Sequence, residues 1–222
     1  NNFSKNDLIN VTVYANEGTV NSSTSASTVL TISNLAPNSS NAVLNATDHP
    51  TNSTDANLTL YWSASDADGD NVKNITDWKL NGTSIAVLNM PFEGGGNSTF
   101  VKDYSNNSDH GNLTTAVWNA TGGRDGFGAY QFNGSTTIYR GESNWQSSAE
   151  SGTITAWIKR NSIGADHTIF SSSRETDASN YFIFYVQSTN DLRIGAVSGG
   201  GGNMVTGNTT FSANQWYHVA VT

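Results

Sequence analysis

The sequence predicts an all-β protein, and three observations support this fold class. Apolar residues alternate with a period of two along most of the 222 residues, and no segment keeps a helical period for three turns. Turn-forming Gly, Asn and Pro separate the short apolar runs, as they do between the strands of sandwiches and jelly rolls. A hydrophobic fraction of 36% is sufficient for a packed core.

The first predicted strands are short and lie far apart in the sequence. Alternation predicts one strand over residues 9–15, which ends at the turn 16–18, and a second over residues 28–33. The segment 34–37 contains Pro37 and breaks the pattern in the way a module boundary does. A further strand is expected over residues 58–64, with its apolar side chains on one face.

A hairpin and an apolar stretch follow. Residues 75–80 predict a strand that carries Trp78, and Asn81 with Gly82 is a strong signal for a two-residue hairpin turn. Residues 85–90 are apolar, and residues 93–96 are expected to form a loop. Beyond residue 100 the predicted strands are longer and more aromatic, at 129–132, 153–159, 167–171, 181–187, 192–197 and 215–222. Residues 181–186 are apolar on both faces and predict a central, covered strand, whereas residues 198–203 predict a loop tip.

Several of these segments carry a family resemblance. The motifs are FGAYQFNG at 127–134, GTITAWI at 152–158 and WYHVAVT at 216–222. In this order they resemble successive strands of a laminin-G-like domain, which is a concanavalin A-like jelly roll. FEG at 92–94 and KDY at 102–104 fit its opening strand and turn. The resemblance implies that further strands complete both sheets of the domain.

The earlier part of the chain resembles bacterial and archaeal surface immunoglobulin-like modules. Residues 51–62, 66–70 and 78–82 are similar to the first half of such a sandwich, and residues 3–18 with 30–33 to the second half. The expected organisation is therefore C-terminal strands of one module over 1–34, the N-terminal half of another over 35–84, and a laminin-G-like jelly roll over 85–222. We interpret this order as a window, truncated at both ends, of a tandem array.

Composition excludes several classes of protein. The net charge is −8 with only 10 Lys and Arg residues, which argues against a nucleic-acid partner. No apolar run approaches the length of a membrane span. The absence of cysteine excludes disulfides, thiolate metal sites and cysteine nucleophiles.

Asn-x-Ser/Thr sequons are about twice as frequent as this composition would produce by chance, and they predict N-glycosylation of an extracellular or cell-surface protein. Their asparagines are Asn2, Asn10, Asn21, Asn38, Asn45, Asn52, Asn57, Asn74, Asn81, Asn97, Asn106, Asn112, Asn119, Asn133 and Asn208. A bias toward Asn, Ser and Thr, which make up 83 residues, is the alternative explanation.

An acidic cluster suggests a calcium site. Asp66, Asp68 and Asp70 alternate in a loop, and Asp77 falls at the twelfth position counted from Asp66. Alternating carboxylates can wrap a hard cation with oxygen ligands, although Asn71 stands where such loops carry glycine. The alternative is a solvated acidic turn between strands. No organic cofactor is expected.

Other candidate residues are sparse, and an enzyme is not expected. Concanavalin A-like glycosidases need two carboxylates close together, and the nearest approach is Glu175 with Asp177 in a stretch that predicts a surface turn. Laminin-G-like domains often hold calcium, which leaves Asp103 and Asp125 as ligand candidates. Among the tryptophans, four lie in predicted strands and are expected in the core, namely Trp62, Trp78, Trp157 and Trp216. Trp118 and Trp145 lie in predicted loops and are candidates for stacking on a sugar ring.

The function expected from these observations is that of a non-enzymatic, glycosylated, structural or adhesion protein of a cell-surface array or fibre. Self-association is expected because half-sandwiches present unpaired strand edges. Two alternatives remain. One is a carbohydrate-binding, lectin-like module, and the other is a non-catalytic fragment of a carbohydrate-active enzyme.

Overall fold

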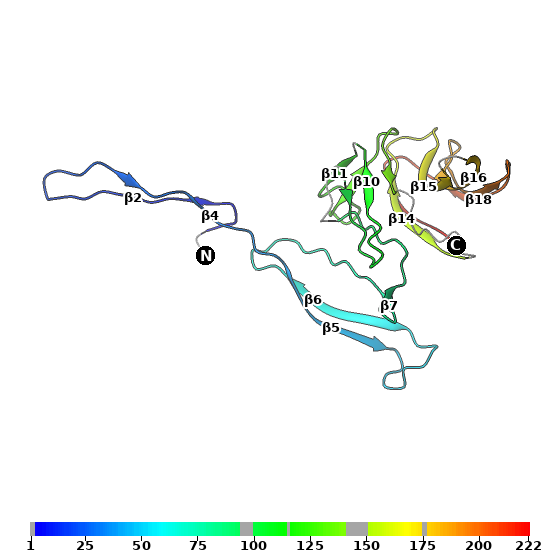
Figure 1. The fold of residues 1–222 in the computed structure, drawn as a ribbon, viewed down its shortest axis with the longest axis horizontal. Coiled ribbons are helices and arrows are strands. Elements are labelled where there is room, and N and C mark those ends of the chain that lie inside the picture. The colour runs from blue at the N-terminus through cyan, green and yellow to red at the C-terminus, as the bar shows by residue number, and fades with distance from the viewer. Residues whose placement is uncertain (1–2, 94–99, 115, 141–150, 175–176) are drawn as a thin grey trace. The chain divides into compact units, whose positions relative to one another are not determined.

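The computed structural model describes residues 3–93, 100–114, 116–140, 151–174 and 177–222. All the regular structure in these residues is β-strand, so the all-β prediction is confirmed (Figure 1). The chain divides into two compact units, unit 1 over Asn1–Ile75 and unit 2 over Thr76–Thr222. In the described part of the chain, nothing helical reaches the length and hydropathy that a membrane crossing requires.

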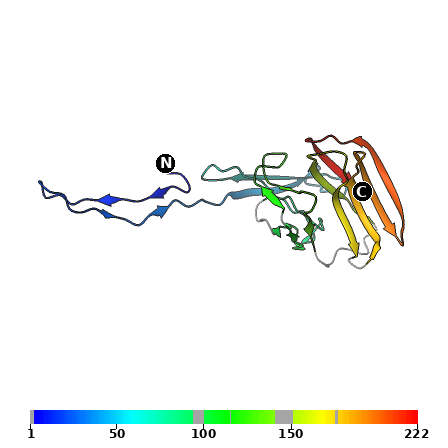
Figure 2. The ribbon, with the colours of Figure 1, turned by 90° about the horizontal axis from the view of Figure 1, so that it is seen from above.

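Unit 1 begins with a long two-stranded ribbon. Strand β1 (Leu8–Ile9) pairs antiparallel with β4 (Leu30–Thr31), and β2 (Thr12–Val13) pairs with β3 (Ser25–Ala26). Figure 2 shows this blue ribbon from above, with its two chain segments running side by side. The single strand predicted over residues 9–15 is therefore two short strands of one ribbon, joined by backbone hydrogen bonds that do not form a continuous ladder.

The second ribbon of unit 1 is longer and more regular. Strand β5 (Asn38–Ala46) pairs antiparallel with β6 (Leu58–Ser65), with a bulge between Ser40 and Val43. Asn41 lies in this bulge with a φ of 56°, a left-handed conformation that asparagine tolerates better than most residues. Strand β6 was predicted from its alternation, whereas β5 was not, because its first half carries polar residues at almost every position.

The described residues of unit 1 contain no buried side chain. Leu8, Val13, Leu30 and Leu58 are 55–68% exposed. The immunoglobulin-like resemblance of residues 1–34 and 35–84 implies a packed core in this part of the chain. None is observed in its described residues, because a two-stranded ribbon has no second sheet against which to bury its apolar face. The immunoglobulin-like assignment of residues 1–34 and 35–84 stays a prediction.

Unit 2 opens with the predicted hairpin. Strand β7 (Lys79–Leu80) pairs with β8 (Thr83–Ser84) across a turn made by Asn81 and Gly82. These two turn residues have φ values of 52° and 84°, the positive values that a type I′ hairpin turn requires. The prediction of the hairpin is confirmed, although the strand expected over residues 75–80 is limited to its last two residues.

A first core lies among short strands. Strand β10 (Gly111–Leu113) pairs with β9 (Phe100–Val101) and β13 (Ile138–Tyr139), while β11 (Val117–Asn119) pairs with β12 (Ala129–Gln131). The buried side chains of this core are those of Val101, Leu113, Ala116 and Tyr130. Gly128 permits the close packing here, because a Cβ at this position would lie 2.4 Å from the Phe92 carbonyl oxygen.

The second core lies between two sheets. Strand β14 (Ile154–Lys159) pairs with β19 (Trp216–Val221). The other sheet has the order β15 (His167–Arg174), β16 (Asp177–Val186), β17 (Asp191–Ser198), β18 (Gly201–Thr210). Side chains from both sheets surround Phe184, Val186, Phe211 and Val219, which are at most 4% exposed. This arrangement confirms residues 181–186 as a central strand with partners on both sides.

Strand β18 contradicts the prediction of a loop tip in this sheet. The loop tip expected over residues 198–203 consists only of Gly199 and Gly200, and β18 begins at Gly201. The glycine run hides the strand from a pattern of apolar alternation, since Gly201 and Gly202 contribute no side chain to it. Gly202 is nevertheless required here, because a Cβ at this position would lie 2.6 Å from the Val197 side chain.

Candidate functional site

The predicted acidic cluster forms a tight turn in unit 1. The Asp66 carboxylate accepts hydrogen bonds from the backbone N–H groups of Asp68, at 2.8 Å, and Asp70, at 3.2 Å. Asp68 accepts a hydrogen bond from the Leu35 N–H at 2.7 Å, and Asp70 pairs with the Lys5 ammonium. Each carboxylate therefore has a structural partner within the unit.

The fourth predicted calcium ligand, Asp77, belongs to unit 2. Its Oδ2 accepts a hydrogen bond from Ser84 Oγ at 2.7 Å and lies 3.6 Å from Lys79 Nζ. Among the described residues, no three His, Asp or Glu side chains are grouped as a metal site requires. Calcium binding by Asp66, Asp68, Asp70 and Asp77 stays a prediction.

Isothermal titration calorimetry tests the calcium prediction. We expect one calcium ion to bind per chain, with an affinity that falls at least tenfold in Asp66→Asn because a charged ligand is lost. Asp55→Asn is the control, since it removes an equal charge outside the cluster. Binding that is absent from the wild-type protein, or unchanged in Asp66→Asn, identifies the cluster as a turn only.

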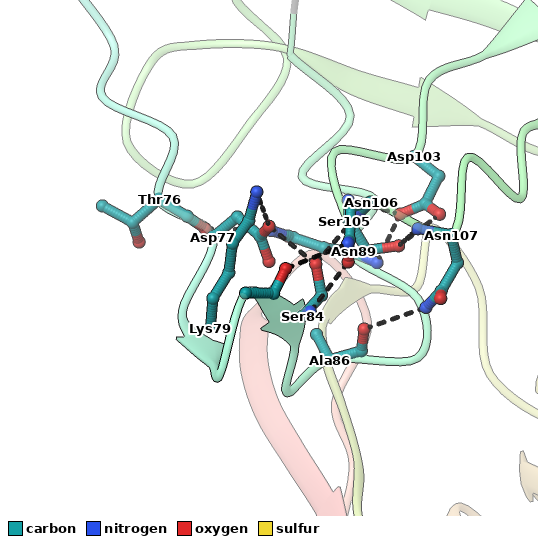
Figure 3. A network of polar contacts seen from close by, with 11 residues as sticks. Thr76, Asp77, Lys79, Ser84, Ala86, Asn89, Asp103, Ser105, Asn106 and Asn107 are labelled. Atoms are coloured by element: carbon teal, nitrogen blue, oxygen red, sulfur yellow. Dashed lines mark hydrogen bonds and ion pairs between the residues drawn. The ribbon is translucent and has the colours of Figure 1, made fainter.

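A polar network ties the β7–β8 hairpin to the loop after β9, as Figure 3 shows. The Ser84 N–H donates to Asn106 Oδ1 at 2.7 Å, and the Asn106 N–H donates to Ser84 Oγ at 2.8 Å. Asn107 Nδ2 donates to the carbonyl oxygen of Val87 at 3.0 Å. These contacts explain why the chain divides after Ile75 rather than at the predicted boundary after residue 84.

Asp103 is the acceptor on which the network converges. Its carboxylate is 2% exposed and accepts hydrogen bonds from the N–H groups of Asn89, Ser105 and Asp109 at 2.8–2.9 Å, and from Ser105 Oγ at 2.6 Å. Burial by itself raises the pKa of Asp103, but these four hydrogen bonds outweigh it and hold the pKa below its ordinary value. Both carboxylate oxygens of this candidate calcium ligand therefore accept hydrogen bonds that organise the loop.

A shallow depression of about 480 Å³ adjoins this network and is lined by Thr76, Asp77, Trp78, Ile85, Ala86 and Asn89. The Trp78 side chain is 40% exposed. Asp77 Oδ1 is buried and has no hydrogen-bond partner in the structure. The depression is open and mainly apolar.

The tryptophans are placed differently from their predictions. Trp62, Trp78 and Trp157 were expected in the core, but they are 40–48% exposed. Trp118, a candidate for sugar stacking, packs against the first core and donates its Nε1–H to the Phe92 carbonyl oxygen at 2.9 Å. Trp145, the other candidate, lies outside the described residues, as does Glu175.

The outward face of the β14–β19 sheet gathers aromatic and cationic side chains that the sequence did not indicate. Trp157 lies opposite His218, with ring centroids 5.1 Å apart, and Lys159 lies opposite Trp216, with its Nζ 5.1 Å from the ring centroid. The Arg124 guanidinium lies 4.2 Å from the Trp157 ring centroid. We call these five residues the indole face. The register of β14 against β19 brings four of them together, and Arg124 reaches Trp157 from the segment between β11 and β12.

His167 belongs to a hydrogen-bonded group around the buried Arg160. It accepts a hydrogen bond from Arg160 Nε at 3.0 Å, and Arg160 also donates to Asn190 and to the Ala165 carbonyl oxygen. Arg160 is 5% exposed, and burial lowers the pKa of its guanidinium. The group joins the loops at one end of the sandwich.

The sequon asparagines have exposed side chains wherever the structure describes them. Asn2 and Asn97 lie outside the described residues, and each of the other 13 has an exposed side chain. Asn106 is the least suited to carry a glycan, because its Nδ2 donates to the Gly82 carbonyl oxygen in the hairpin network. Exposure is a necessary condition for glycosylation, which stays a prediction.

Comparison with known families supports one of the two resemblances. Residues 132–222 match a laminin G family model that is described as the concanavalin A-like lectin/glucanases superfamily. No curated protein and no solved structure was found to match the chain. The laminin-G-like resemblance is therefore confirmed for the segment that contains β13–β19, and such a domain fits a carbohydrate-binding or adhesion module.

Proposed function

We propose that this chain, with its laminin-G-like segment as the folded body, is a non-enzymatic, glycosylated extracellular protein that acts in adhesion and self-association at a cell surface. The observation that carries the proposal is the uncovered apolar surface of unit 1. Monomeric proteins rarely leave large apolar areas exposed, and two-stranded ribbons are marginally stable without a covering layer. A partner surface supplies that layer.

A second copy of the chain is the partner we propose for unit 1. Strands β5 and β6 contain nine and eight residues and not one charged side chain. Their exposed apolar residues include Val43, Leu44, Tyr61 and Trp62, which are 42–57% exposed. Although the net charge is −8, these strands of two copies can meet without like-charge repulsion.

Glycosylation is the second part of the proposal, and an extracellular location follows from it. The exposed side chains of the 13 described sequon asparagines support this part of the proposal. With only 13% charged residues, the chain has few charges to keep it soluble, and sugars would supply the missing hydration.

The self-association of unit 1 is tested by light scattering during size-exclusion chromatography of the glycosylated chain over a range of concentrations. We expect a dimer or larger assembly, and at least a tenfold weaker association in Leu44→Lys, which places a charge in the contact. Leu80→Lys is the control, because Leu80 is 68% exposed in the unit 2 hairpin. A wild-type protein that stays monomeric at its highest soluble concentration contradicts the proposal.

Carbohydrate binding is a second candidate function, and the indole face is the observation that favours it. The CH groups of a sugar ring stack on indole rings, while Arg124 and Lys159 match carboxylate or sulfate groups. The chain has only 10 Lys and Arg residues, and two of them belong to this face. An acidic polysaccharide is the ligand class that this chemistry fits.

Titration with a uronic acid-containing polysaccharide, followed by tryptophan fluorescence, tests this second function. We expect Trp157→Ala to weaken binding at least tenfold and Trp78→Ala, an exposed tryptophan of a different surface, to leave it unchanged. Binding is expected to weaken as salt is added, because the charges are exposed. Equal affinity in Trp157→Ala removes the indole face as the site.

A further inference from the structure

The four-stranded sheet of unit 2 has one edge without a charged residue. In the described part of the chain, the long strands with a single partner in unit 2 are β14, β15, β18 and β19. Strand β14 contains Lys159, β15 contains His167 and Arg174, and β19 contains His218. Strand β18 contains no charged residue, no histidine and no proline over its ten residues.

Such an edge favours pairing with another chain. All ten residues of β18 are exposed, and Val205 and Met204 are 65% and 42% exposed. Its ladder to β17 is regular from the Ser198–Gly201 pair to the Arg193–Thr206 pair. Long, uncharged and accessible edge strands offer unpaired backbone groups to a neighbouring copy. Strand β18 has neither the charge nor the proline that commonly blocks such an edge, and its one bulge lies beyond Thr206, outside the regular stretch.

The same strand carries the last sequon of the chain. No sequon other than that of Asn208 follows Asn133, so the 89 residues 134–222 contain one, and it lies on β18. The ladder is irregular at this point: Thr206 pairs with Arg193 and Thr210 with Asp191, so β18 uses four steps where β17 uses two. Asn208 lies in the middle of this bulge, and its side chain is exposed.

We propose that an N-linked glycan on Asn208 covers the free edge of β18 and prevents the four-stranded sheet from pairing with a second copy. A branched saccharide is wider than the roughly 4.8 Å between neighbouring strands, so it blocks the approach of another strand. The glycan takes the place of the lysine, arginine or histidine side chain that each of the other long edge strands of unit 2 carries. The inference depends on the proposed glycosylation, and it restricts self-association to unit 1.

The test uses the full chain, produced in a host that glycosylates sequons, with the occupancy of each site read by mass spectrometry. Asn208→Gln and Thr210→Ala both remove the sequon, the second while keeping the asparagine. We expect both variants to form larger assemblies than the glycosylated parent at equal concentration. Hydrogen exchange in these assemblies is expected to become slower in the amides of residues 202–206.

Two controls separate the glycan from other effects. Asn208→Lys removes the glycan but supplies a charge at the same position, so it is expected to keep the assembly state of the parent. Asn133→Gln removes a sequon in the turn after β12 and is expected to change nothing. A wild-type Asn208 without glycan overturns the inference, as does a parent-like assembly state in Asn208→Gln. Occupancy of other sequons alongside an empty Asn208 leaves the proposed function standing and removes this inference alone.

Discussion

Replacing Asp103 by alanine is expected to lower the free energy of unfolding of unit 2 by about 3 kcal/mol, because several buried donors lose their acceptor at once. The carboxylate receives hydrogen bonds from three backbone N–H groups and from the Ser105 hydroxyl while being 2% exposed. Urea unfolding followed by tryptophan fluorescence measures the loss. Ser105→Ala removes one of the four hydrogen bonds and is expected to cost about 1 kcal/mol.

The Asp103 contribution also has an expected pH dependence. The pKa of this carboxyl is lowered in the folded protein, so its contribution is fully present above the ordinary value of 3.8 and is lost as the pH falls through the lowered folded pKa. The stability difference between the wild type and Asp103→Asn is therefore expected to be constant from pH 5 to pH 8. It is expected to shrink below about pH 4. A difference that persists unchanged at pH 2 means that the charge of Asp103 does not contribute.

Replacing Phe184 by alanine is expected to cost about 4 kcal/mol, because Phe184 is the largest of the fully buried side chains among the described residues. The Phe184 ring is 1% exposed and lies in the core between the β14–β19 sheet and the four-stranded sheet. Its removal leaves a cavity that side chains of both sheets line. The variant is expected to unfold at a much lower urea concentration, as measured by near-ultraviolet circular dichroism.

Phe132→Ala is the matched control for Phe184→Ala. Phe132 is 44% exposed just after β12, so the same truncation is expected to cost less than about 1 kcal/mol. Equal losses at the two positions would mean that the second core does not hold the sandwich together. A loss at Phe184 alone supports the packing of the two sheets as the source of stability.

Local sequence patterns were sufficient to predict those strands whose own residues alternate between apolar and polar or are continuously apolar. Strands β6, β14, β17 and β19 begin within two residues of the first residue predicted for them. Strand β16 begins four residues before its predicted first residue. Each contains alternating or continuous apolar residues that favour an extended chain in any context. The turn at Asn81 and Gly82 was equally predictable, since both residues tolerate the positive φ that a tight hairpin requires.

The candidate site was less predictable because its parts meet through pairing. In the sequence, Asp103 is one of several scattered carboxylates. Only the folded loop after β9 brings backbone N–H groups within hydrogen-bonding distance of it. The indole face exists because β14 and β19, more than fifty residues apart in sequence, pair in the register that sets Trp157 opposite His218. A sequence pattern carries no information on that register.

The sequence by itself determined the all-β class, the laminin-G-like resemblance of the C-terminal segment, the sequons and the absence of cysteine chemistry. These properties depend on residue type and on short-range periodicity, which are present before folding. The tertiary structure decided which tryptophans are exposed, which carboxylate is buried and which strand edge has no partner among the described residues. Trp62 and Trp157 alternate as core residues do, yet they remain exposed because burial requires a second layer, and no second sheet covers those faces in the described residues.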